Sequence, residues 1–120
     1  MAWAWPAGGP VTTAFDDQRS KGLSISGKAG DPVLAAADGR VVYAGSGLRG
    51  YGNLVIVKHN ATYLTAYAHN QSLLVKEDQA VRRGQKIAEM GSSDTDRVHL
   101  HFEVRRLGKP VDPAKVLPPR

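Results

Sequence analysis

Turn signals recur about every ten residues along this chain, and they limit its fold more than any other feature of the sequence. Clusters rich in glycine, proline, aspartate and serine stand at residues 8–10, 27–32, 38–39, 45–52, 83–84, 91–93 and 108–110. With 13 glycines and 7 prolines among 120 residues, this spacing leaves room for short strands only. We therefore expect an all-β chain without a long helix.

The segments between the turns have the composition and periodicity of strands. Residues 40–44, 54–59, 63–69, 86–90 and 100–105 are rich in β-branched and aromatic side chains. In 63–69, one face carries Tyr63, Thr65 and Tyr67, and the other carries Leu64, Ala66 and Ala68. Such alternation predicts a mainly antiparallel sheet with one buried face.

Helical structure is expected at one place only. Asp112 can cap a single turn over residues 112–117, with Pro113 at its first helical position. His59 ends an apolar run, and we expect it to be a surface or packing residue at the end of a strand and not a ligand.

The length of the chain indicates one domain, residues 1–120, and its composition narrows the chemistry that the domain can perform. The absence of cysteine excludes disulfides, thiolate zinc sites and cysteine nucleophiles. A net charge of +5 favours acidic partners. The basic residues are scattered without a nucleic-acid motif, so we expect no nucleic-acid partner. No apolar run reaches the length of a membrane span.

His99-Leu100-His101, beside a strand-like Phe-Glu-Val-Arg, is the strongest chemical signal. Two imidazoles at i and i+2 on a strand point the same way and can share one metal or one substrate atom. Catalytic zinc needs about three protein ligands and an open position. The pair therefore represents half of a zinc site.

Several motifs, in order, resemble one family. They are Trp5-Pro6, Lys21-Gly22-Leu23-Ser24-Ile25, the run 31–42, Gly50-Tyr51-Gly52-Asn53, Tyr67-Ala68-His69, Gly84-Gln85 and His99-Leu100-His101-Phe102-Glu103. Over about 5–117 the chain resembles a LytM domain, the lysostaphin-type zinc endopeptidase domain that cuts peptidoglycan cross-bridges. The resemblance implies a β-sandwich of duplicated hairpin motifs with an open groove.

The resemblance also assigns roles by position. Active members carry His-x-Gly-x-Asp, a Tyr-x-His segment and His-x-His. Here His69 and His99 would act on the attacked water, and His101 would bind zinc, while the other ligand pair falls on Ser20 and Ser24. Neutral hydroxyls are poor zinc ligands. We therefore expect no zinc cofactor and no catalysis, with His101 as the residual metal candidate.

The runs 38–54 and 63–70 are similar to the NlpD/EnvC type of degenerate LytM domain, although members of that type often lose the His-x-His pair. This implies a domain that binds and activates a periplasmic N-acetylmuramoyl-L-alanine amidase for septal peptidoglycan cleavage and daughter-cell separation. The expected groove residues are Ser20, Ser24, His69, His99, His101, Tyr67, Tyr51 and Arg49. It also implies a periplasmic protein held at the outer membrane. Residues 1–6 are not a signal peptide, so we expect any signal, lipid anchor or LysM module to precede Met1.

Three alternatives stay open at this point. A zinc endopeptidase could recruit a carboxylate from Asp16, Asp17, Asp94 or Asp96, although turns favour aspartate for local backbone bonding. A passive peptidoglycan-binding module could use the positive charge and the groove. A biotinyl or lipoyl carrier hairpin is suggested by residues 84–90, but Gly91 stands where the modified lysine should be.

Overall fold

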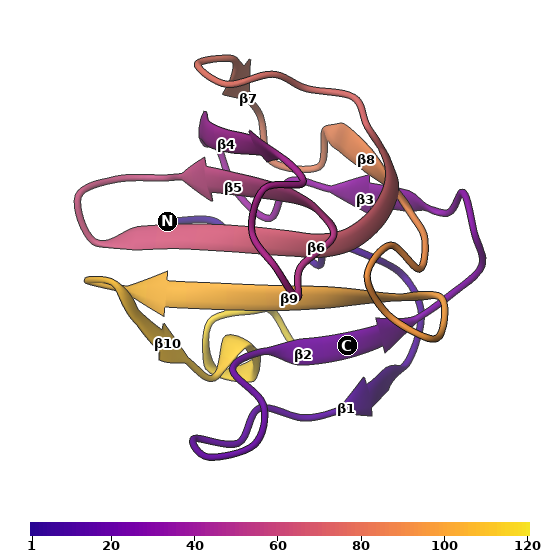
Figure 1. The fold of residues 1–120 in the computed structure, drawn as a ribbon. Helices are drawn as coiled ribbons and strands as arrows, with labels where there is room; N and C mark the ends of the chain where they lie inside the picture. Colours follow the sequence, from indigo (N-terminus) through magenta and orange to yellow (C-terminus); the bar gives the residue numbers. More distant parts are fainter.

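A computed structural model describes residues 1–120, and its regular secondary structure consists of strands and one short 3₁₀ turn (Figure 1). The elements are β1 (Val11–Thr13), β2 (Leu23–Ser26), β3 (Pro32–Leu34), β4 (Gly39–Gly45), β5 (Asn53–Lys58), β6 (Tyr63–Leu73), β7 (Ala80–Val81), β8 (Lys86–Met90), β9 (His99–Arg106), β10 (Lys109–Val111) and the single 3₁₀ turn η1 (Pro113–Lys115). Every strand pair is antiparallel. The predicted all-β, antiparallel fold is confirmed.

The long strands β6 and β9 form the middle of the sheet. The strand order is β1-β2-β9-β6-β5-β4-β7, with β10 beside the far end of β9. β8 pairs with the end of β6 and with β3. The register of β6 and β9 runs from Tyr63 opposite Arg106 to Ala68 opposite His101. The His-x-His segment therefore begins one of the two central strands.

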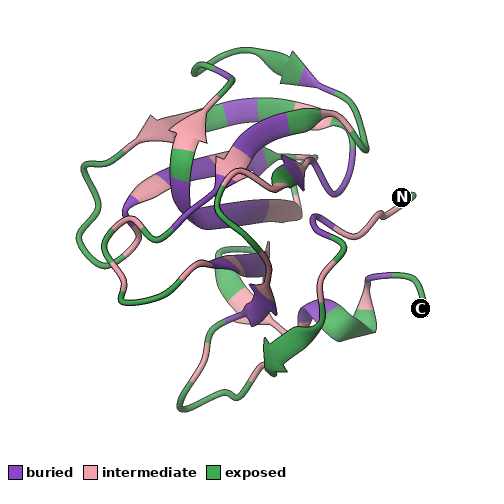
Figure 2. Cartoon of the chain, turned by 90° about the vertical axis from the view of Figure 1, so that its right-hand side faces the viewer, coloured by how far each residue is buried: buried purple, intermediate pink, exposed green.

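The main core lies on one face of this sheet. Tyr67 and Phe102 pack with ring centroids 5.4 Å apart, and Val33 of β3 and Ile87 of β8 close over the same cluster. Figure 2 shows buried residues in the facing strands and exposed residues in the connections. β3 and β8 cover this face of the sheet. The opposite face of β2, β9 and β6 is therefore left to form the groove.

Two local expectations are met, one near the end of the chain and one in its middle. Asp112 caps η1, its Oδ1 accepting a hydrogen bond from the Ala114 amide at 3.0 Å. His59 is a packing residue as predicted: its ring nitrogens lie 2.7 Å from the Asp38 carbonyl oxygen and 2.8 Å from Thr65 Oγ1. Trp3 packs edge-on against the His59 ring. No helix has the length and apolar character needed to cross a bilayer.

Candidate functional site

His69 reaches the groove because β6 changes its side-chain alternation at this residue. In a regular strand His69 would share a face with Tyr67, since side chains two residues apart point the same way. His69 instead has a φ of 71°, in the left-handed region. Opposite β5, Tyr67 pairs with Val55 but Asn70 pairs with Asn53, so β6 holds one extra residue. This bulge leaves Tyr67 in the core and turns His69 to the other face.

Regular alternation on β9 supplies the remaining imidazoles. His99 and His101 lie on the face opposite the buried Leu100 and Phe102. The ring centroids of His69 and His99 are 4.8 Å apart, and those of His69 and His101 are 6.2 Å apart. Three histidines from two adjacent strands thus form one cluster.

Each imidazole is oriented by a hydrogen bond on one side. His69 Nδ1 lies 2.8 Å from the Ser93 carbonyl oxygen. His99 Nδ1 lies 3.1 Å from the Arg97 carbonyl oxygen. His101 Nε2 lies 2.8 Å from Glu103 Oε2. The opposite ring nitrogens have no hydrogen-bond partner within the chain and are left for a ligand or solvent.

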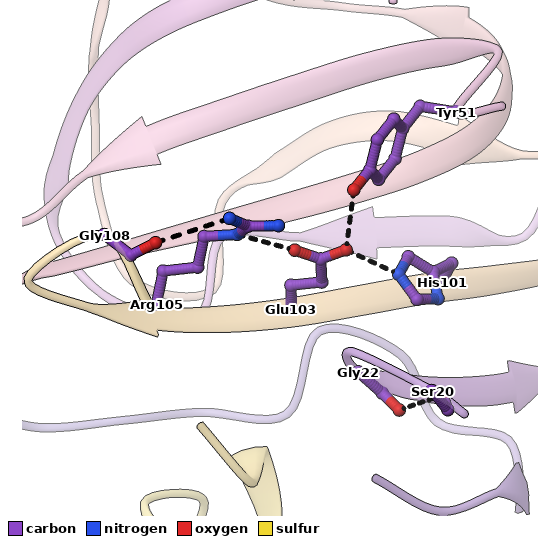
Figure 3. Close-up of polar contacts among 7 residues, drawn as sticks. All are labelled: Ser20, Gly22, Tyr51, His101, Glu103, Arg105 and Gly108. Atoms are coloured by element: carbon purple, nitrogen blue, oxygen red, sulfur yellow. Dashed lines mark hydrogen bonds and ion pairs between the residues drawn. The ribbon is translucent and has the colours of Figure 1, made fainter. Parts of the chain in front are cut away.

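Glu103 connects the histidine cluster to the neighbouring surface (Figure 3). This carboxylate is 1% exposed. Besides contacting His101, it accepts hydrogen bonds from Arg105 Nε at 2.8 Å and from the Tyr51 hydroxyl at 3.1 Å. Arg105 is in turn close to the Gly108 carbonyl oxygen. A buried carboxylate with this many donors is stabilised in its charged form.

The electrostatics of the cluster follow from burial and these contacts. Burial lowers the pKa of His69, and the nearby His99 and His101 lower it further. Burial also lowers the pKa of His99. For Glu103, burial raises the pKa, but hydrogen bonds from His101 and Arg105 outweigh it, and the net pKa is lowered. The site therefore favours neutral imidazoles at positions 69 and 99 beside a charged carboxylate.

The other side of the groove is built by β2 and the turn before it. Ser24 lies directly opposite His101 in the β2–β9 ladder and is 6% exposed. Ser20 lies in a tight loop closed by a bridge with Asp16. Its hydroxyl donates to the Gly22 carbonyl oxygen at 2.8 Å, as Figure 3 shows. Both side chains on this side are small and neutral.

An open pocket of about 410 Å³ lies between the two sides. Its lining residues are Arg19, Ser20, Lys21, Gly50, Tyr51, His69, His101 and Glu103. In Figure 1 the β4–β5 connection crosses β6 to reach β9, and the Tyr51 carbonyl oxygen accepts the His69 amide at 2.8 Å. A larger hollow of about 860 Å³ lies between residues 15–19 and 110–115 but contains none of the histidines. The smaller pocket is therefore the candidate site.

Four of the eight residues expected in the groove do not line this pocket: Ser24, Arg49, Tyr67 and His99. Ser24 and His99 nevertheless lie beside it, opposite His101 and against the His69 ring respectively. Tyr67 is fully buried in the core, where its hydroxyl oxygen accepts the Ala36 amide at 2.9 Å. The prediction that Tyr67 lines the groove is wrong, because the bulge at His69 places the side chains of Tyr67 and His69 on opposite faces of the sheet. Arg49 is exposed in the β4–β5 loop and is absent from the pocket lining.

Two of the aspartates considered as replacement ligands bind backbone amides, Asp16 within its own turn and Asp94 in the distant β4–β5 loop. Asp16 Oδ1 accepts the Gln18 amide at 2.9 Å, and Asp94 Oδ2 accepts the Gly50 amide at 2.7 Å. None of the four aspartates lines the pocket. The carboxylate that does line it is Glu103, to which the sequence analysis assigned no role. The signal was present as His-x-His-x-Glu, because this alternation puts three polar side chains on one face.

The side chains around His101 can be compared with the ligands that a catalytic zinc ion needs. Around His101 stand Ser24 across the ladder and Ser20 in the pocket, and neutral hydroxyls are poor zinc ligands. No three His, Cys, Asp or Glu side chains are arranged as a metal-binding group. The residues present do not fit a catalytic zinc ion.

An antiparallel sheet with a histidine-lined groove over His-x-His defines the class: a domain of the β-sheet metallopeptidase type. The chain belongs to peptidase family M23, whose model matches residues 18–113. The LytM-type family expected from the motifs is thereby confirmed.

Three comparisons place the chain within this family. It is 63% identical over 120 residues to the lipoprotein NlpD/LppB homolog of Pseudomonas aeruginosa, covering 98% of this chain and 40% of that protein. It is 54% identical over 120 residues to the murein hydrolase activator NlpD of Escherichia coli, covering 98% of this chain and 32% of that protein. A zinc-containing peptidase from Vibrio cholerae superimposes with a TM-score of 0.91 at 33% identity, covering 98% of this chain and 41% of that one. The chain thus spans well under half of each.

Proposed function

We propose that this chain is a non-catalytic M23 domain that binds and activates a murein hydrolase, specifically a periplasmic N-acetylmuramoyl-L-alanine amidase acting in daughter-cell separation. One observation carries the proposal: opposite the clustered histidines, β2 and the turn before it place serine hydroxyls and no imidazole or carboxylate. Such a groove keeps a concave binding surface but lacks the ligands that hydrolysis requires.

The proposal assigns Ser20 and Ser24 to the two missing ligand positions of the zinc endopeptidases. His101 would then be the single remaining ligand, and its Nε2 already contacts Glu103. Activation of water near neutral pH depends on a firmly held metal ion. Without it, His69 and His99 have no activated water to act upon, and we assign them to the floor of a binding groove.

The names of the relatives support the same role. The relative from E. coli is named a murein hydrolase activator, and the one from P. aeruginosa a lipoprotein. We propose that this domain works in the periplasm as part of a longer protein anchored to the outer membrane. Peptidoglycan is then the substrate of the partner.

The test is stimulation of a purified amidase. Dye-labelled sacculi are incubated with the amidase, with this chain, and with both together. We expect release of dye with the mixture far above that with the amidase alone, and none with the chain alone. Dye release by the chain alone, abolished by a chelator, would instead identify an endopeptidase.

A zinc endopeptidase is the second candidate, because the three imidazoles remain clustered. Metal analysis after purification with added zinc separates the two readings. One zinc ion per chain would contradict the proposed degenerate site. Sacculus binding without amidase stimulation would favour a passive peptidoglycan-binding module.

A further inference from the structure

A second apolar cluster lies on the groove face of the sheet, beyond the histidines. Leu54, Ala66 and Ala68 are buried there, and the partly exposed Tyr51 and Ile56 pack against them. They belong to β5, β6 and the β4–β5 loop, and Ala66 stands opposite Glu103 in the β6–β9 ladder. The main core on the other face is closed by β3 and β8, whereas this cluster borders an open pocket.

That pocket has a volume of about 400 Å³ and is mainly apolar. Its lining residues are Leu48, Tyr51, Leu54, Ile56, Leu64, Ala66, Glu103, Arg105 and Gly108. Leu48 is 44% exposed at its rim. A pocket of this kind on a sheet face suits an aliphatic side chain of another molecule.

The apolar pocket and the histidine pocket form one continuous surface. Tyr51 and Glu103 line both of them. The Tyr51 ring also lies beside His101, with centroids 6.1 Å apart. A segment lying along this face would therefore contact both pockets at once.

Basic side chains stand at both ends of this surface. Arg105 lines the apolar pocket, and Arg19 and Lys21 line the histidine pocket. The one carboxylate shared by the pockets, that of Glu103, already accepts hydrogen bonds from Arg105 and Tyr51. With a net charge of +5 for the chain, the surface is complementary to an acidic segment.

Resting on the proposed function, we propose that this surface docks an acidic segment of the hydrolase through an aliphatic anchor. The anchor enters the pocket beside Leu48 and Leu64, and carboxylates next to it pair with Arg105 at one end and with Arg19 and Lys21 at the other. The anchor supplies affinity by burial of apolar area, and the carboxylates fix its direction along the groove.

The test uses short peptides and the intact chain. A peptide with two leucines flanked by glutamates is titrated against the isotope-labelled chain, and amide resonances are followed by NMR. We expect shifts at Leu48, Leu64 and Arg105. Matched peptides with lysine in place of glutamate, or serine in place of leucine, should bind at least tenfold more weakly.

Leu48→Asp tests the pocket, and Leu74→Asp is the matched control. The two leucines are 44% and 49% exposed, and Leu74 lies outside the pocket. Both variants should keep the circular dichroism of the parent chain. We expect Leu48→Asp to weaken binding of the leucine–glutamate peptide at least tenfold, and Leu74→Asp to leave its binding unchanged.

Four outcomes overturn the docking surface: equal binding of the serine or lysine peptide, shifts at other residues, unchanged binding by Leu48→Asp, or stronger shifts of the same resonances with a muropeptide. The last would assign the surface to peptidoglycan. Amidase stimulation is measured in parallel. Stimulation that survives in Leu48→Asp removes the docking surface and keeps the proposed function. Peptide binding without stimulation by the parent chain keeps the surface and removes the proposed function.

Discussion

The two sides of the groove differ in chemistry although they are built by neighbouring strands of one sheet. On β6 and β9, three imidazoles are each oriented by a backbone carbonyl or a carboxylate. On β2 and the preceding turn, Ser20 and Ser24 offer hydroxyls only. Ser24 nevertheless pairs directly with His101 in regular antiparallel register. The comparison teaches that backbone pairing builds the groove, and that a few side chains decide what chemistry the groove can perform.

The largest expected effect comes from converting the serine side. Ser20→His combined with Ser24→Asp places an imidazole and a carboxylate near His101, whose Nδ1 has no hydrogen-bond partner in the chain. We expect one zinc ion per chain with a Kd of micromolar or below, equivalent to about 8 kcal/mol or more. Calorimetric titration with zinc measures it.

The single change Ser24→Asp is the control for that conversion. It adds one carboxylate without the imidazole, so zinc binding should be far weaker than in the double variant. If the double variant binds no zinc, the two sides have drifted from ligand geometry, and their difference lies in the backbone as well as in the side chains.

The next effect concerns the histidine side. Glu103→Ala removes a buried carboxylate that accepts hydrogen bonds from Arg105 and Tyr51. We expect the free energy of unfolding to fall by about 3 kcal/mol, because breaking one partner of a buried ionic contact leaves the others uncompensated. Urea denaturation measures the change.

Glu89→Ala is the matched control for this variant. Its carboxylate pairs with Lys86 at 3.1 Å, but neither side chain is buried, so the loss should be far smaller than that of Glu103→Ala. Equal effects in the two variants would show that Glu103 does not hold the histidine side together.

Part of the pH dependence of stability should come from the histidine side, in addition to that of His59, whose pKa burial also lowers. Burial lowers the pKa of both His69 and His99 below 6.5. The unfolded chain then binds more protons than the folded chain in this range, so stability is present above the unfolded pKa and is lost as pH falls from about 7 to 5.

Denaturation midpoints across this pH range test the assignment. His69→Gln should flatten the profile, since it removes one titrating imidazole, whereas Ser24→Ala should leave its slope unchanged. A profile that His69→Gln does not alter would place the titration elsewhere in the chain.

The smallest effect is expected on the serine side. Ser20→Ala removes the hydrogen bond from its hydroxyl to the Gly22 carbonyl oxygen. Ser20 is partly exposed and the lost bond is a single one between neutral groups, so we expect a loss of about 1 kcal/mol in the free energy of unfolding. Thermal and urea denaturation should both detect little change, and a loss as large as that of Glu103→Ala would contradict the contrast between the two sides.

Much of the fold was predictable because its signals are local. Turn residues mark the ends of short strands, and alternation assigns side chains to faces. On β9 the rule holds throughout, so His99 and His101 were correctly placed together. The rule failed on β6, where Tyr67 and His69 have the same spacing but lie on opposite faces. A bulge with a left-handed residue depends on pairing with β5, and no local pattern announces it.

The sequence by itself determined the strand-rich architecture, the family and the identity of the side chains available to the groove. These follow from residue types and short spacings, which do not change with context. Tertiary structure alone decided that Tyr51 joins the row formed by His101, Glu103 and Arg105 on β9, and that an apolar pocket continues the groove past the histidines. Those features bring together residues far apart in the chain, so they depend on strand register and loop placement, which only the folded sheet fixes.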